Sequence, residues 1–210
     1  MTDLDEAELN RRANEKARKR KEARDKMLAT KTIEKGLLIV HTGKGKGKST
    51  AAFGLAARAL GNGMKVGVVQ FVKGKWQTGE RVVLEAFPDQ ITIRTMGEGF
   101  TWETQDRARD IAAARAGWEM AKEMIEAARS DPPAFDMIVL DELNIVLRYD
   151  YLPIEEVLEV LANRPPDLHV VVTGRNAKEP LIEAADLVTE MTMVKHPFRA
   201  GVKAQKGIEF

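Results

Sequence analysis

The segment that ends at Thr50 carries residue types that bind phosphate. It is rich in glycine and lysine and ends in two hydroxyls: Gly43, Lys44, Gly45, Lys46, Gly47, Lys48, Ser49 and Thr50. Glycines let successive backbone N–H groups converge on an anion without a Cβ in the way. In such a loop the lysine reaches the phosphates and the next hydroxyl is a ligand of Mg²⁺. We therefore predict that this loop binds ATP and that Ser49 contacts Mg²⁺; a surface turn is the alternative.

The flanking residues support a phosphate loop. An apolar run, residues 36–40, precedes the loop and predicts a strand, and residues 51–58 predict a helix whose N-terminus points at the anion. Arg58 lies on this helix and is a candidate ATP ligand. The spacing is irregular, because the usual pattern has a glycine five residues before Gly47, where this chain has Thr42. The loop is therefore one residue short, which alters how a triphosphate lies in it.

A second candidate site is the acidic pair Asp141-Glu142, which follows the apolar run 137–140. Carboxylates at the end of a strand beside the phosphate strand hold Mg²⁺, directly or through water. Hydrolytic ATPases use the same pair, in which the glutamate orients water, so an ATPase is an alternative function for this chain. Gln70, at the end of another apolar run, is a further candidate ATP ligand.

Two later segments have residue types suited to ligands. In residues 97–104, Phe100 and Trp102 stand beside glycines and suit stacking on a large flat ligand, although they equally suit a loop that caps the core. Residues 194–205 are basic, and Lys195, Arg199 and Lys203 could meet phosphates or carboxylates. Residue types alone favour an exposed tail for the second segment.

The elements that position these residues alternate between strands and helices. Near-continuous apolar runs predict strands at Leu37–Val40, Val66–Val72, Ile91–Thr95, Met137–Leu140, His169–Thr173 and Leu187–Met191. Helices are expected between them at Lys48–Leu60, Glu80–Phe87, Gln105–Arg129, Ile154–Ala162 and Glu179–Ala185. This alternation predicts an α/β fold with a doubly wound, mostly parallel, six-stranded sheet.

Residues 1–35 differ from this domain, which spans residues 36–210. They are rich in Ala, Glu, Lys and Arg, with acidic residues first and basic ones later, an order that suits the dipole of a helix. We expect a charged N-terminal arm that is either helical or disordered. It is solvated, or it docks on a ligand or a second subunit.

Bulk composition excludes several classes of protein. The 210 residues carry a formal charge of +1, which gives no general attraction to nucleic acid or membranes. Cysteine is absent, so disulfides, zinc–thiolate sites and thiol catalysis are excluded. The charged start is not a signal peptide, and no apolar run is long enough to span a bilayer. We expect a cytoplasmic protein.

Taken together, the motifs resemble the ATP:corrinoid adenosyltransferase family of the cob(I)alamin and cob(I)yrinic acid a,c-diamide type. The similarity runs from the arm to the C-terminus. The loop around Phe-Thr-Trp-Glu-Thr (100–104) and the tail Lys-His-Pro-Phe-Arg-Ala-Gly-Val-Lys-Ala-Gln (195–205) are its most specific parts. The phosphate loop alone would fit many enzymes.

The resemblance implies a RecA-like phosphate-loop fold and a chemistry. Cobalt(I) of a corrinoid attacks the 5′ carbon of ATP and expels triphosphate, and family members act as homodimers with Mg-ATP. By resemblance, Phe100 and Trp102 face the corrin and displace its lower axial ligand, and Ser49, Asp141 and Glu142 lie at Mg²⁺. The arm can fold over the corrinoid site, and ATP lies in the shortened loop in reversed polarity.

Cobalt(I) is already a strong nucleophile, so the enzyme needs alignment and leaving-group stabilisation rather than an acid or base. Because the chain lacks cysteine, the electron must come from outside, for instance from a reduced flavoprotein. Two alternatives are a RecA-like ATPase or kinase, which would release phosphate or a phosphorylated product, and an ATP-gated nucleic-acid binder. The near-neutral charge argues against the binder.

Overall fold

The computed structural model describes residues 3–72, 78–96 and 106–209. The chain separates into two compact units, Met1–Glu34 and Lys35–Phe210. In the first unit, α1 (Asp3–Ala29) is one long helix. Side chains one turn apart form ion pairs along it, for example Glu8 with Arg12. Of the two forms that composition left open for the arm, the structure has the helical one.

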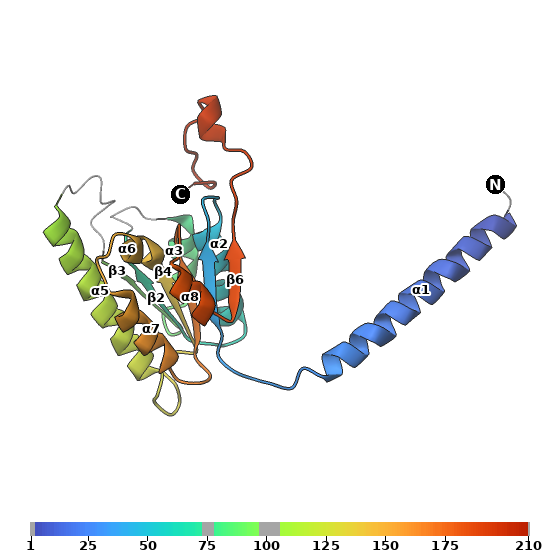
Figure 1. Cartoon of the computed structure of the whole chain (residues 1–210), viewed down its shortest axis with the longest axis horizontal. Coiled ribbons are helices and arrows are strands. Elements are labelled where there is room, and N and C mark those ends of the chain that lie inside the picture. Colours follow the sequence, from blue (N-terminus) through green and yellow to red (C-terminus); the bar gives the residue numbers. More distant parts are fainter. Residues whose placement is uncertain (1–2, 73–77, 97–105, 210) are drawn as a thin grey trace. The chain divides into compact units, whose positions relative to one another are not determined.

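The second unit is built on a six-stranded sheet, drawn in Figure 1. Its strands are β1 (Leu38–Thr42), β2 (Val66–Gln70), β3 (Ile91–Thr95), β4 (Met137–Asp141), β5 (His169–Thr173) and β6 (Leu187–Glu190). They lie in the order β3-β2-β4-β5-β1-β6, and every pairing is parallel. The predicted six-stranded, mostly parallel sheet is confirmed, and the predicted strand ends differ by at most two residues.

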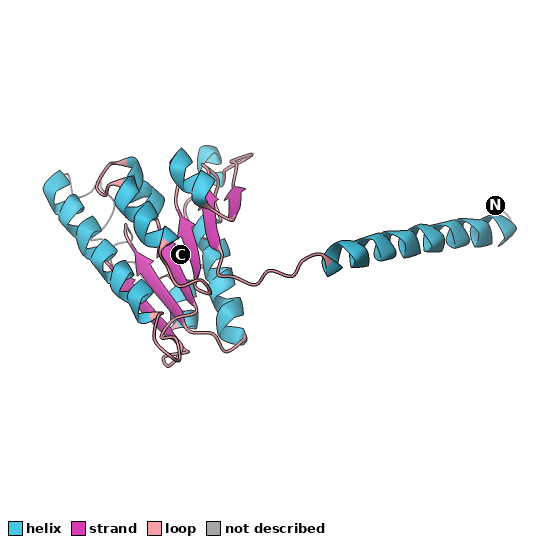
Figure 2. Cartoon of the chain, turned by 60° about the horizontal axis from the view of Figure 1, so that its bottom comes forward, coloured by secondary structure: helices cyan, strands magenta, loops and turns pink. Residues whose placement is uncertain are grey.

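Helices cover both faces of the sheet, as Figure 2 shows. Side chains of α2 (Lys48–Gly61) and α3 (Gly79–Leu84) pack on one face. The other face is covered by α5 (Arg107–Ala127), α6 (Leu143–Arg148), α7 (Ile154–Ala162) and α8 (Glu179–Ala184). The doubly wound arrangement is therefore confirmed. Two short helices, α6 and the 3-10 helix η1 (Pro197–Ala200), were not predicted.

The carboxyl ends of the six strands form a row of polar residues along one side of the sheet. Because all pairings are parallel, every strand ends at the same side of the sheet, and each ends in a polar residue: Thr42, Gln70, Thr95, Asp141, Thr173 and Glu190. Ligands of open α/β sheets bind outside this edge. The phosphate loop leaves β1 here, so the fold places the loop and the acidic pair on one side. Within the described ranges, no helix has the length and apolarity needed to cross a bilayer.

Candidate active site

The phosphate loop packs tightly against the chain that follows β6. Gly43 has a φ of 96°, and a Cβ on it would lie 2.4 Å from the carbonyl oxygen of Met191. A Cβ on Gly45 would lie 2.6 Å from the carbonyl oxygen of Thr192, and its N–H donates to the carbonyl of Met191 at 2.6 Å. The first two glycines of the loop are therefore needed for backbone packing as well as for anion approach.

The third glycine sets the start of α2. Gly47 is the N-cap of this helix, with a φ of 103°, so that Lys48 is its first residue. The Lys48 side chain is buried, and its Nζ donates to the carbonyl of Gly45 inside the loop. His41 supports the turn, with Nδ1 3.3 Å from the carbonyl oxygen of Lys48. The ammonium is thus held where a phosphate oxygen could replace a backbone carbonyl as its acceptor.

The charges around the loop are mainly positive. Burial lowers the pKa of Lys48, and Arg175 and Lys46 lower this pKa further, while the negative charge of Glu142 opposes the shift. Cations gathered around the loop favour an anionic ligand. In this structure Lys46 pairs with the carboxylate of Glu209 near the C-terminus.

The remaining loop residues line its outer side. Lys44 is exposed, and Ser49 and Thr50 lie in the first turn of α2, where Ser49 is half-buried and Thr50 exposed. Both residues therefore lie at a helix N-terminus, which favours anions.

A chain of hydrogen bonds joins four strands at the sheet edge. Asp141 is fully buried and accepts from the Thr173 hydroxyl at 2.8 Å and from the Gln70 amide at 3.2 Å. The Thr95 hydroxyl donates to the amide oxygen of Gln70 at 3.1 Å. Gln70, a predicted ATP ligand, thus has its amide engaged with neighbouring strands and orients Asp141.

Glu142 leaves β4 in the left-handed backbone conformation, with a φ of 64°. Its N–H donates to the Thr173 hydroxyl at 2.9 Å, which fixes this turn. A non-glycine residue in this conformation is uncommon, and such backbone strain concentrates at functional sites. The turn brings the Glu142 carboxylate within electrostatic reach of Lys48.

The oxygen donors at this edge suit Mg²⁺. Magnesium keeps several waters and is bound by one or two carboxylates together with substrate phosphates. Hard oxygen donors of this type come from Ser49 at the start of α2, from Asp141 at the end of β4 and from Glu142 in the turn that follows it. The described residues contain no cluster of three acidic or histidine side chains, so they offer no all-protein metal cage. This is the donor set expected for a metal that arrives with ATP.

Two predicted ATP ligands, Arg58 and Lys203, are not brought into this group. Arg58 lies in the last turn of α2, ten residues after Lys48, which is roughly 15 Å along the helix axis. Lys203 is exposed in the segment that follows η1. The predicted corrinoid-facing residues, Phe100 and Trp102, lie outside the described residues.

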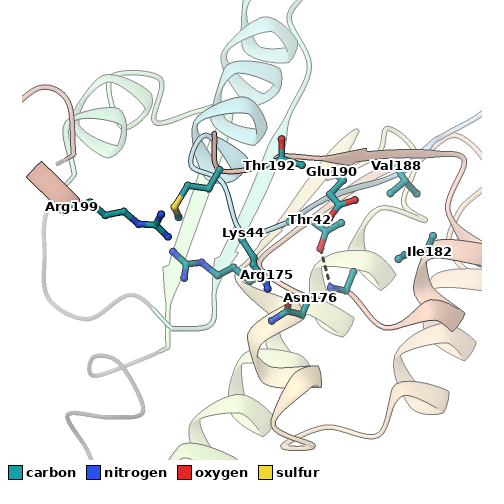
Figure 3. A pocket seen from close by; sticks show the side chains of 12 residues that line it. Thr42, Lys44, Arg175, Asn176, Ile182, Val188, Glu190, Thr192 and Arg199 are labelled. Atoms are coloured by element: carbon teal, nitrogen blue, oxygen red, sulfur yellow. Dashed lines mark hydrogen bonds between the residues drawn. The ribbon is translucent and has the colours of Figure 1, made fainter. Parts of the chain in front are cut away.

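The structure adds residues that the motifs did not indicate. Thr173 holds both acidic residues through one hydroxyl, and the fully buried Asn144 donates to the carbonyl of Gly174 at 3.1 Å. The sequence signal for Thr173 was its place as the polar last residue of an apolar strand. A cavity of about 700 Å³ opens beside the start of the phosphate loop, as Figure 3 shows.

Comparison with known proteins decides between the families that share this architecture. Residues 34–210 match the family "ATP:corrinoid adenosyltransferase BtuR/CobO/CobP". The chain belongs to the ATP:corrinoid adenosyltransferases. It is 58% identical to a corrinoid adenosyltransferase of a Sinorhizobium species, over 93% of this chain and 90% of the relative. It is 53% identical to the corrinoid adenosyltransferase of Pseudomonas aeruginosa, over 97% and 98% of the two chains.

Some solved structures that align with this chain are distant in sequence. One is the flagellar accessory protein FlaH from Methanocaldococcus jannaschii, which is 12% identical, with a TM-score of 0.48 over 77% of this chain and 73% of that chain. No functional conclusion follows from a likeness of this degree. The family resemblance inferred from the sequence motifs is confirmed by the match over residues 34–210.

Proposed function

We propose that this chain transfers the 5′-deoxyadenosyl group of ATP to the cobalt(I) of a corrinoid and releases triphosphate, in adenosylcobalamin biosynthesis or salvage. The observation that carries this proposal is the family match over residues 34–210, which include the shortened phosphate loop and the acidic pair. The reaction forms a cobalt–carbon bond and breaks the bond between the 5′ carbon and its oxygen. The electron pair of the broken bond leaves with the triphosphate.

The phosphate loop binds the leaving group in this proposal. Residues 43–50 surround the triphosphate with backbone N–H groups, and Lys48 turns from the Gly45 carbonyl to a phosphate oxygen. Because the departing triphosphate gains negative charge, cations placed around it stabilise the transition state more than the bound substrate. We keep Lys203 as a proposed ATP ligand on the exposed tail, together with Gln70 and Arg58. On the described geometry, Gln70 acts through Asp141, and Arg58 lies far along α2.

Mg²⁺ is proposed to be held by Ser49, Asp141 and Glu142 together with ATP. When bound, it would neutralise charge on the phosphates. Thr173 and Gln70 hold the Asp141 carboxylate in place whether or not a ligand is present, because both hydrogen bonds are made within the protein. The acidic pair therefore serves leaving-group binding here.

The corrinoid face is assigned to Phe100 and Trp102 by resemblance. Apolar rings would exclude water from the lower face of the corrin and favour loss of its lower ligand, which makes cobalt(II) easier to reduce. We further propose a cytoplasmic homodimer that receives its electron from a reduced flavoprotein. Molecular mass in solution tests the dimer, and reduction of a bound cobalt(II) corrinoid by a reduced flavoprotein tests the donor.

Mixing the protein with ATP and a chemically reduced corrinoid tests the activity. We expect a change in the visible spectrum as the cobalt–carbon bond forms, and we expect Lys48→Ala to weaken the use of ATP with every corrinoid. Absence of an adenosylated product from the wild-type protein under strong reductant would refute the proposal. Arg129→Gln, two residues after the end of α5, is a matched control for loss of a cation.

A further inference from the structure

The cavity beside the phosphate loop brings together Arg199, which the sequence already indicated as a candidate for phosphates or carboxylates, and Arg175, which lies outside the phosphate loop and the acidic pair. It has a volume of about 700 Å³ and is shown in Figure 3. Its lining comes from the end of β1 and the loop, from the turn between β5 and α8, from α8, and from β6 and the tail that follows it: Thr42, Gly43, Lys44, Arg175, Asn176, Ala177, Ile182, Val188, Glu190, Thr192, Met193 and Arg199. The start of the phosphate loop and the last part of the chain, which are far apart in sequence, thus meet around one space at the carboxyl ends of the strands.

Two guanidinium groups face each other at this cavity. Figure 3 shows the side chains of Arg175 and Arg199 pointing toward one another, with Lys44 nearby and Glu190 on the side of β6. Neither guanidinium forms a hydrogen bond or an ion pair with another described residue. Two cations that converge without a carboxylate between them repel each other, and an anion placed between them would remove this cost.

The turn that carries Arg175 is fixed by its backbone. Gly174 has a φ of 126°, and a Cβ on it would lie 2.8 Å from the Cβ of Asn144. Asn144 donates to the Gly174 carbonyl at 3.1 Å, and the N–H of Ala177 donates to the Thr42 hydroxyl at 2.9 Å. A turn that is tied both to α6 and to the last residue of β1 holds the base of the Arg175 side chain in register with the phosphate loop.

The tail segment that carries Arg199 is locally ordered as well. In η1, the His196 side chain accepts from the N–H of Phe198 at 3.2 Å, and Gly201 ends the helix with a φ of 75°. Arg199 therefore approaches the cavity from a short helix, on the side opposite Arg175. Arg175 lies within electrostatic reach of Lys48, the phosphate-binding lysine.

We propose that Arg175 and Arg199 form a clamp that binds the triphosphate of ATP and holds it as the bond to the 5′ carbon breaks. This inference rests on the proposed function, since it specifies how the leaving group is bound. A guanidinium presents N–H donors in a planar fork that fits phosphate oxygens in pairs. The oxygen released from the 5′ carbon keeps the bonding electron pair, so the triphosphate becomes more negative as it leaves, and the clamp strengthens at that moment.

Binding of inorganic tripolyphosphate to the full-length protein tests the clamp without a corrinoid. Calorimetric titrations of the wild type, Arg175→Gln and Arg199→Gln are compared with the control Arg129→Gln. We expect each clamp variant to bind tripolyphosphate about tenfold more weakly, because each loses a charge-assisted contact, and the control to bind as the wild type does. Arg175→Lys, which keeps the charge and loses the fork, should lie between Arg175→Gln and the wild type.

A tripolyphosphate affinity that stays within twofold of the wild type in both glutamine variants would overturn the clamp. This outcome is separable from failure of the proposed function, since the wild type would still form the adenosylated corrinoid. If the wild type forms no such product, the proposed function fails irrespective of the titrations. Thermal unfolding of each variant shows whether a loss of affinity comes from misfolding. If Arg175→Gln is misfolded, the comparison of Arg175→Lys with the wild type tests the clamp instead.

Discussion

Thr173→Val is the substitution whose cost follows most directly from the structure. The side chain is completely buried, and valine reproduces its shape without its hydroxyl. That hydroxyl donates to the buried carboxylate of Asp141 at 2.8 Å and accepts from the N–H of Glu142 at 2.9 Å. Loss of a partner by a buried polar group costs about 1–3 kcal/mol, and more for a charged group. We therefore expect the free energy of unfolding to fall by roughly 2–5 kcal/mol.

Urea unfolding without nucleotide measures this change. Thr189→Val on β6 is the matched control, because Thr189 is exposed and the same atoms are removed there. We expect the control to change the free energy of unfolding by less than about 0.5 kcal/mol. We also expect Thr173→Val to raise the KM for Mg-ATP, since both acidic residues lose a contact that orients them. An unfolding free energy equal to that of the control would refute the assigned network.

Three further predictions concern ligand binding. Phe100→Ala or Trp102→Ala should keep ATP binding but slow turnover on corrinoids that carry a lower axial ligand. An equal loss of turnover on corrinoids without a lower axial ligand would contradict the role given to these two residues. Burial lowers the pKa of Lys48, and a bound triphosphate raises this pKa. ATP binding should therefore take up a proton, and the affinity for ATP should fall as the pH rises through the pKa that Lys48 has in the ligand-free protein. Calorimetry in buffers of different ionisation enthalpy measures this proton uptake, which Lys48→Met should abolish. Glu209→Gln removes the carboxylate that pairs with Lys46, so tripolyphosphate should bind more tightly to this variant; unchanged or weaker binding would exclude competition between the tail and the phosphates.

The central strands β1, β2, β4 and β5 were predictable because they are almost uniformly apolar, whereas the outer strands β3 and β6 are only partly so. A parallel sheet covered on both faces requires this pattern, and the polar residue that ends each strand marks the functional edge. The phosphate loop was predictable because its function depends on residue types close together in sequence. The short helix α6 was not, since Leu143–Arg148 follows the acidic pair directly and is too short for a helical period to show.

The partners of the site residues could not be read from local sequence. Thr173 lies 32 residues after Asp141, and only the strand order makes them neighbours. The need for Gly43 and Gly45 to pack against Met191 likewise depends on β6 lying beside β1. Arg58 was predicted as an ATP ligand because it is close to the loop in sequence, but it lies at the opposite end of α2 from Lys48.

The products formed from ATP test the central claim most directly. The wild-type protein is incubated with Mg-ATP and a cobalt(I) corrinoid, and triphosphate, diphosphate, phosphate and adenosylated corrinoid are quantified in the same sample. Adenosyl transfer predicts triphosphate and adenosylated corrinoid in equal amounts, with neither formed when the corrinoid is omitted. Release of phosphate or diphosphate with no cobalt–carbon product would contradict the account and would instead indicate an ATPase or a kinase.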